Sequence, residues 1–154
     1  MEALTRDAEV LRFTRLPEPV PPGFTREWLA RYVQGREDGT SAGFAAVGDD
    51  GEFLGLALAV SIDAEAREAE LGYIVAPAAR RRGVARELLR QLTRWAFAEA
   101  GVLRATLLIE AGNAASLRVA ERAGYVPEGV MRSVHLKQGR RIDQAVWSRL
   151  PSDP

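Results

Sequence analysis

The chain has 154 residues, of which 47% are apolar and 27% are charged, a composition typical of one globular domain. Its 21 basic and 21 acidic side chains cancel, which argues against a nucleic-acid partner. The absence of cysteine excludes disulfides, cysteine-ligated metals and a cysteine nucleophile, and the single histidine, His135, argues against a histidine-rich metal site.

The N-terminal segment predicts neither a signal peptide nor a membrane anchor. Residues 1–10 intersperse charged side chains among small ones, with no basic region followed by an apolar run. The longest apolar stretch, residues 53–60, is far short of the roughly 20 residues that cross a bilayer. We therefore expect a cytoplasmic protein with no membrane partner.

Residues 10–16 alternate apolar and polar side chains, which predicts a half-buried strand. Four prolines within residues 17–22 end this pattern and predict a stiff, extended connector. Thr25 can then cap a helix that runs to about Gly35, with Trp28 on its apolar face.

Three consecutive strands are expected next. Residues 42–47 and 53–62 flank the turn Asp49-Asp50-Gly51, which is typical of a β-hairpin, and residues 69–75 form a third apolar run. Strands without intervening helices favour an antiparallel meander. A Rossmann fold is disfavoured, because the chain has no Gly-x-Gly-x-x-Gly motif.

The second half alternates helices and strands. Residues 83–100 have the spacing of a long amphipathic helix that Gly101 can end. The remaining pattern gives a strand over 103–109, a helix from Asn113 to Ala123, and strands over 129–136 and 141–150 around the turn Gln138-Gly139. The predicted order is β α β β β α β α β β, in a single domain over 1–154.

A basic loop precedes the long helix. Residues 80–154 hold 14 basic and 7 acidic side chains, the reverse of residues 1–79, and the sequence Arg80-Arg81-Arg82-Gly83-Val84-Ala85 opens the helix. A helix N-terminus presents unpaired N–H groups at the positive end of its dipole, and arginine pairs with phosphate oxygens. The junction predicts a phosphate site, with a solvated basic surface as the alternative.

This loop resembles the Gln/Arg-x-x-Gly-x-Gly/Ala pyrophosphate loop of the GCN5-related N-acetyltransferase (GNAT) superfamily. The segment from Asn113 and Ser116 through Gly124-Tyr125 to Glu128-Gly129 resembles the corresponding segment of the RimJ/RimL-like branch, which acetylates N-termini of ribosomal proteins. Leu71-Gly72-Tyr73 and Asp143…Trp147-Ser148 fit the same branch. The resemblance covers about residues 67–150. It implies a GNAT fold, a mixed and mostly antiparallel sheet with helices on both faces, and acetyl-CoA as co-substrate.

The resemblance also implies where acetyl-CoA would bind. The pantetheine arm would lie in a V-shaped gap beside the fourth strand of that fold, near Ile74 and Val75. The pyrophosphate would be held at the loop, by Arg80, Arg81, Gly83, Val84 and Ala85. Asn113 and Ser116 would reach the thioester end, although the same pair can cap a helix, and the two roles are compatible.

Direct attack of an amine on a thioester needs a neutral amine, a donor to the developing oxyanion and a proton for the leaving thiolate. The resemblance assigns the oxyanion to a backbone N–H near Val75. Many family members have a tyrosine seven residues after the asparagine, where this chain has Ala120. Ser116 is therefore the first candidate acid and Tyr125 the second.

Two glutamates are candidate bases, Glu70 first and Glu110 second. Glu70 lies one residue away from the position of the catalytic carboxylate in the histone-type enzymes of this superfamily. Because successive side chains of a strand point to opposite faces, Glu70 is expected on the opposite face of the sheet from that carboxylate. Either could instead be a surface carboxylate or the partner of an arginine.

The missing tyrosine and uncertain base favour an amine that loses its proton easily. An α-amine, with a pKa of about 8, costs roughly 1.4 kcal/mol to deprotonate at pH 7, against roughly 4.6 kcal/mol for lysine. The sequence thus predicts an N-acetyltransferase acting on a protein or peptide N-terminus. A small-molecule amine acetyltransferase and a degenerate CoA-binding regulatory module are the alternatives, and both monomer and dimer remain open.

The acceptor pocket is expected between the proline-rich segment, the first long helix and the Gln138-Gly139 hairpin. Acidic side chains of residues 37–70 would attract the cationic amine. His135, Trp95 and Trp147 are expected to pack structurally.

Overall fold

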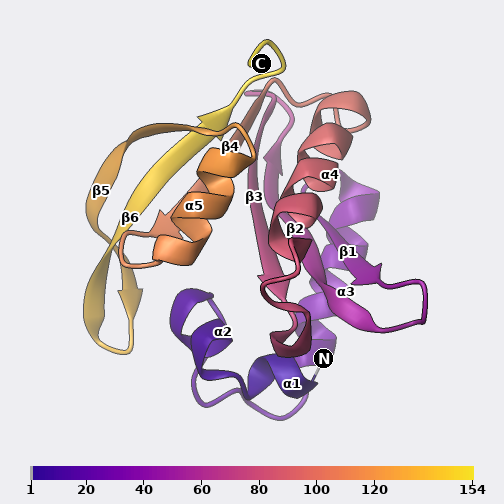
Figure 1. Ribbon diagram of the computed structural model, residues 1–154, viewed down its shortest axis with the longest axis vertical. Coiled ribbons are helices and arrows are strands. Elements are labelled where there is room, and N and C mark those ends of the chain that lie inside the picture. The colour runs from indigo at the N-terminus through magenta and orange to yellow at the C-terminus, as the bar shows by residue number, and fades with distance from the viewer. Residues whose placement is uncertain (1) are drawn as a thin grey trace.

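The computed structural model describes residues 2–154, and its centre is a six-stranded sheet with the strand order β1-β2-β3-β4-β6-β5 (Figure 1). The strands are β1 Ala42–Val47, β2 Phe53–Asp63, β3 Glu68–Val75, β4 Arg104–Glu110, β5 Val126–Lys137 and β6 Arg140–Arg149. Only β3 and β4 pair in parallel. The predicted mixed, mostly antiparallel sheet is confirmed.

Helices cover both faces of this sheet (Figure 1). The helices are α1 Glu2–Thr5, α2 Ala8–Phe13, α3 Phe24–Asp38, α4 Val84–Ala98 and α5 Ala114–Arg122, and a 3-10 turn spans Pro77–Ala79. Leu89 of α4 packs with Leu71 in one core, whereas Val10 of α2 packs with Ile74 in the other. β3 supplies both cores, because successive side chains of a strand point to opposite faces. No helix among residues 2–154 is long and apolar enough to span a membrane.

The predicted strand over residues 10–16 is wrong, because Ala8–Phe13 form a short helix. The Asp7 carboxylate accepts a hydrogen bond from the Val10 backbone N–H at 2.9 Å, which caps that helix. Val10 and Leu16 are buried in the core beneath it. An alternating pattern this short fits either structure, and the cap and the tertiary burial select the helix.

The next helix also differs in its ends. It starts at Phe24 after Gly23, not at a cap on Thr25, and it continues to Asp38. The left-handed Gly39, with φ of +71°, ends it. From β1 onward the predicted elements are confirmed within a few residues, the largest change being that β5 begins at Val126.

The parallel strands β3 and β4 pair only at their beginning and then diverge (Figure 1). Their pairing covers Glu68–Glu70 and Arg104–Thr106, after which β3 continues along β2 and β4 along β6. The Ala76 N–H donates to the Leu54 carbonyl of β2 at 2.9 Å. Along an antiparallel pair, residues that are hydrogen-bonded to the partner strand alternate with residues that are not. Val75 and Tyr73 therefore turn their backbone groups away from β2, into the gap between β3 and β4.

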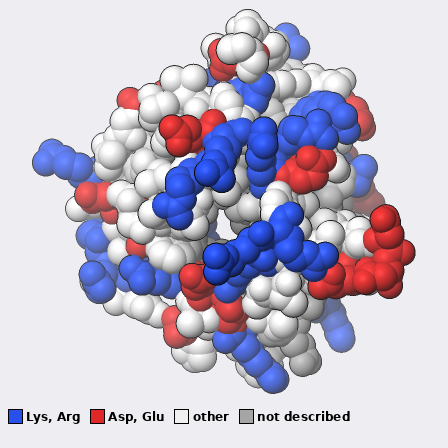
Figure 2. Space-filling model, in the orientation of Figure 1, with Lys and Arg blue, Asp and Glu red and all other residues white. Residues whose placement is uncertain are grey.

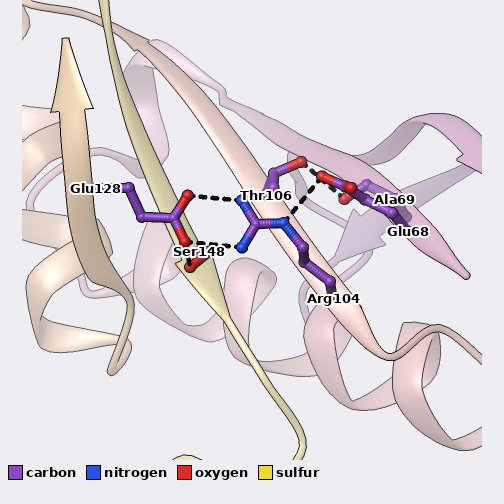
Figure 3. Close-up of polar contacts among 6 residues, drawn as sticks. All are labelled: Glu68, Ala69, Arg104, Thr106, Glu128 and Ser148. Carbon is purple, nitrogen blue, oxygen red and sulfur yellow. Dashed lines mark hydrogen bonds and ion pairs between the residues drawn. The ribbon is translucent and has the colours of Figure 1, made fainter. Parts of the chain in front are cut away.

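A polar network joins four strands at the closed end of this gap (Figure 3). Arg104 donates two hydrogen bonds to Glu128, at 2.7 and 2.6 Å, and a third to Glu68 at 3.2 Å. The Ser148 hydroxyl donates to Glu128 at 2.6 Å. Thr106 donates to the Ala69 carbonyl at 3.2 Å. The glutamate of the Glu128-Gly129 motif thus fastens β5 and β6 to the point where β3 and β4 separate.

This network predicts a pH-dependent loss of stability. Hydrogen bonds from Arg104 and Ser148 lower the pKa of Glu128 from 4.5 to about 2. Because the folded-state pKa is the lower one, the stabilisation is complete above about pH 4.5 and is lost as the pH falls towards about 2. Glu128→Gln should lower the free energy of unfolding by about 1 kcal/mol at neutral pH, a value reduced for the pair's partial exposure.

Urea unfolding at pH 7 and near pH 2.5 measures this effect. The difference between wild type and Glu128→Gln should shrink at the acidic pH. Glu121→Gln, a change at an exposed glutamate of α5, should leave stability unchanged at both pH values. An equal loss for Glu128→Gln at both pH values would mean that the carboxylate charge is unimportant.

Candidate active site

A cavity of about 570 Å³ lies where β3 and β4 diverge. Its walls come from both strands and β2, from the start of α5, from α3, from the end of α2 with the segment after it, and from the parts of β5 and β6 next to their turn. Five of the sequence candidates line it, namely Glu70, Ile74, Glu110, Asn113 and Ser116. Residues from distant parts of the chain therefore meet in one space that extends through the gap in the sheet.

The predicted phosphate loop leads into α4, and its residues do not line this cavity. Gly83 adopts a left-handed φ of +81° and precedes the first turn of α4, which receives no side-chain cap. The first-turn N–H groups of Val84 and Ala85 are thus free of a capping side chain at the positive end of the helix dipole. Figure 2 shows Lys and Arg side chains gathered around a hollow near the centre of this face. These features fit the pyrophosphate of a CoA molecule.

The arginines of this loop have different partners. Arg80 pairs with Asp7 and with Glu9, the latter at 2.9 Å, so its side chain fastens the start of α2. The hydrogen bond from Arg80 lowers the pKa of Asp7. Arg82 pairs with Glu52 at 2.8 Å. Arg81 is exposed and forms no ion pair with a described residue, so it is the loop guanidinium available to an added anion.

Asn113 and Ser116 lie at the start of α5, on the wall formed with β4. The Asn113 side chain accepts a hydrogen bond from the Ser116 backbone N–H at 3.1 Å, so the predicted cap is confirmed. Both side chains also line the cavity. The cap therefore fixes the position of the Ser116 hydroxyl next to the gap.

Tyr73 is a functional candidate that the sequence analysis missed. Its side chain lines the cavity, and its hydroxyl is buried with no well-formed hydrogen bond to any described residue. Burial raises the pKa of Tyr73, and the nearby Ser116 hydroxyl opposes part of that rise. A buried hydroxyl without a partner is costly unless a ligand satisfies it. The Leu71-Gly72-Tyr73 motif is the signal in the sequence that includes this residue, and it indicated the family but not a role for the hydroxyl.

Tyr125, the second candidate acid, is not brought into the cavity. Its hydroxyl lies 2.7 Å from that of Thr93 on α4, and burial raises the pKa of Tyr125 to about 12. The residue thus fastens the end of α5 to α4. Ala120, at the family's usual tyrosine position, is fully buried.

Comparison with known proteins settles the family. The model of the acetyltransferase (GNAT) domain matches residues 1–126, most of the chain. The chain belongs to the GNAT family. The protein named "Putative ribosomal N-acetyltransferase YdaF" of Bacillus subtilis is 29% identical over 124 residues. That match covers 80% of this chain but only 65% of the relative, so this GNAT chain spans part of the relative's length.

Solved GNAT structures share the fold. RimL, the ribosomal L7/L12 alpha-N-protein acetyltransferase in complex with coenzyme A, has a TM-score of 0.86 at 20% identity, covering 96% of this chain and 84% of RimL. Spermidine N-acetyltransferase from Vibrio cholerae in complex with CoA and spermine has a TM-score of 0.84 at 21% identity, covering 99% and 88%. These structures confirm the predicted GNAT fold, and the match to YdaF is consistent with the predicted RimJ/RimL-like branch.

Glu70 faces the other side of the sheet of this GNAT chain, as the strand alternation predicts. Its carboxylate accepts a hydrogen bond from Arg15 at 2.8 Å, and its side chain is 20% exposed against 49% for Arg15. Glu110 also lines the cavity. Burial, Arg15 and Lys137 together lower the pKa of His135, and the nearby Glu110 carboxylate offsets part of that shift.

The predicted acceptor regions do meet at this side. Lys137, near the β5–β6 turn, donates to backbone carbonyls at the end of α2, those of Leu11, Arg12 and Thr14. Gln138 donates to Glu18 in the proline-rich segment at 2.6 Å. Trp28 and Tyr32 of α3 complete the wall. The hairpin therefore holds the N-terminal segment against this side of the cavity.

The expected acidic surroundings of the acceptor are not found. Among the described residues, Glu70 is the one acidic side chain of residues 37–70 that lines the cavity. The acidic turn at Asp49 and Asp50 lies elsewhere, since neither residue lines it. A surplus of acidic residues in half a chain does not decide which of them face a cavity.

Proposed function

We propose that this GNAT chain is a cytoplasmic, acetyl-CoA-dependent N-acetyltransferase whose acceptor is the α-amine of a protein or peptide N-terminus. One observation carries the proposal. The cavity brings the unpaired part of β3 and the start of α5, which suit the thioester end of CoA, together with a glutamate on the opposite face, which suits an amine; the uncapped start of α4 follows β3 in the chain, outside the cavity. A ribosomal N-acetyltransferase among the relatives supports this choice of acceptor.

The residues proposed to bind CoA lie on β3 and on the loop that opens α4. Backbone N–H groups of Arg81, Gly83, Val84 and Ala85 would hold the pyrophosphate, with the Arg81 side chain adding charge. Backbone groups at Val75 and Tyr73, next to Ile74, would hold the pantetheine arm. Acetyl-CoA supplies an acetyl group activated as a thioester.

The chain offers a group for each proton and charge in the transfer. Glu70 would take the proton of the acceptor ammonium, directly or through water, and the Val75 N–H would donate to the developing oxyanion. As the nitrogen–carbon bond forms and the carbon–sulfur bond breaks, Ser116 or Tyr73 would donate one proton to the leaving thiolate, and the proton lost by the new amide nitrogen would restore that hydroxyl. Burial keeps Tyr73 protonated and able to donate, because it raises the pKa of its hydroxyl.

Thiol release from acetyl-CoA in the presence of amines tests the function. Peptides with free N-termini should give thiol release and an acetyl group on the α-amine, located by tandem mass spectrometry. The same peptides with blocked N-termini and an internal lysine should give neither. Acetyl-CoA binding without thiol release across peptides and small amines would favour the regulatory module instead.

Removing the proposed base should affect the reaction most at neutral pH. Glu70→Gln should lower kcat/KM by about 100-fold at pH 7, a typical contribution of a general base. The loss should shrink near pH 9, because an α-amine with a pKa of about 8 is then largely neutral without help. Glu65→Gln, at an exposed glutamate outside the cavity, is the control. A loss independent of pH would show that Glu70 is not the base.

A further inference from the structure

The side of the cavity lined by α2 with the segment after it, α3 and β5, here called the acceptor half, is basic. Arg12, Arg15, Arg31 and Lys137 line it, against the two carboxylates Glu70 and Glu110. An amine-binding site is expected to attract a cation, so this excess of positive charge needs an explanation. It points to an anionic group on the acceptor, away from the reacting amine.

Two of these cations, the guanidinium groups of Arg12 and Arg31, make no hydrogen bond or ion pair with a described residue. Lys137 is occupied by the carbonyls at the end of α2, and Arg15 by Glu70. Arg12 is exposed and lies over the Phe13 ring at 4.7 Å. Arg31 is also exposed and makes no ion pair with a described residue. The guanidinium groups of Arg12 and Arg31 are therefore available to carboxylates, which arginine binds in bidentate geometry.

The positive charges surround polar groups on two walls. On the α3 wall, Arg15 and Arg31 lie close enough to Tyr32 to oppose the rise that burial gives its pKa. On the β5 wall, Arg15 and Lys137 add to burial in lowering the pKa of His135. A ligand with several ammonium groups would be repelled from both walls.

Glu70 is less exposed than the arginines around it. Its side chain is 20% exposed against 49% for Arg15, and Arg12 and Arg31 are exposed as well. Glu70, Arg12 and Arg31 line one cavity, so the residues that follow the amine of an extended peptide, which advances about 3.3 to 3.6 Å per residue, would lie towards those arginines. This order places an amine inside and acidic groups outside.

We propose that the acceptor is a peptide N-terminus with Asp or Glu within the residues that follow the first, recognised by Arg12 and Arg31. The proposal rests on the proposed function and narrows its substrate. It favours an acidic N-terminal peptide over a polyamine.

Three peptides of equal length and identical N-terminal residue test this specificity, with Glu, Ser or Lys in the second to fourth positions, and spermidine is the fourth acceptor. We expect kcat/KM for the Glu peptide to exceed that for the Lys peptide by about tenfold at low salt, with a smaller ratio as salt screens the charges. The Arg12→Glu, Arg31→Glu double variant should remove or invert the ratio. Arg26→Glu, on the same helix as Arg31 but outside the cavity, should leave it unchanged.

Equal rates for the three peptides would overturn the specificity and leave the proposed function intact. Faster acetylation of the Lys peptide or spermidine would overturn it as well. Calorimetric titration of the peptides in the presence of CoA measures their binding preference independently of turnover. Tighter binding of the Glu peptide without any turnover would support the specificity and contradict the proposed function, whereas no preference in binding or turnover would contradict the specificity.

Discussion

The Tyr73→Phe variant should lose about 100-fold in kcat while its KM for acetyl-CoA changes little, because general acids contribute about 10²- to 10⁴-fold. The substitution removes one buried hydroxyl and keeps the ring that packs in the core. Since that hydroxyl makes no well-formed hydrogen bond with a described residue, its removal should not destabilise the fold. Steady-state kinetics and thermal unfolding together measure this combination.

Two variants accompany this prediction. Tyr125→Phe removes the contact with Thr93 and should lower stability by about 1 kcal/mol while leaving kcat unchanged. Ser116→Ala should lower turnover more than cofactor affinity, and an equal loss in both would make Ser116 a binding residue. Wild-type turnover in Tyr73→Phe would leave Ser116 as the sole candidate acid in this cavity.

The Gly83→Glu variant should lose the thermal shift that acetyl-CoA produces in the wild type. A carboxylate at the start of α4 repels the pyrophosphate where the helix N-terminus would attract it. A Cβ at Gly83 meets no atom within 4 Å, so the side chain fits, although the φ of +81° adds about 1 to 2 kcal/mol of strain.

Gly83→Ala separates the strain from the charge. It carries the same φ penalty without the carboxylate, so it should be less stable than the wild type and still respond to acetyl-CoA. Arg81→Glu should weaken the response in the same direction as Gly83→Glu, because Arg81 is the unpaired guanidinium of the loop. A full thermal shift in Gly83→Glu would place the cofactor elsewhere on the molecule.

Local signals explain why much of the fold could be predicted from the sequence. Gly83, Asn113 and Gly124 mark helix ends by their backbone and capping preferences, and the structure has helix ends at these positions. The segment before α3 lacked such a clear signal. Its residues 10–16 suit a strand by alternation, and only the Asp7 cap and the core beneath α2 select a helix.

The candidate site was predictable where it depends on one element and not where it depends on several. Ser116 and Asn113 share the start of α5, so their placement followed from the motif. The importance of Tyr73 depends on the divergence of β3 and β4, and Arg80 is engaged by Asp7, which is 73 residues away in the chain. Likewise, the basic character of the acceptor half comes from side chains of α2, α3 and β5 that only the fold brings together.

A crystal structure of the protein with CoA tests the central claim most directly, namely that CoA extends from the start of α4 into the gap between β3 and β4 and meets an amine site in the cavity there. We expect the pyrophosphate on the N–H groups at the start of α4, the pantetheine along Val75 and Tyr73, and the sulfur within hydrogen-bond distance of Ser116 or Tyr73. The Glu70 side of the cavity should remain open for an acceptor. CoA bound outside the gap, or filling the cavity as far as Glu70, would contradict this account.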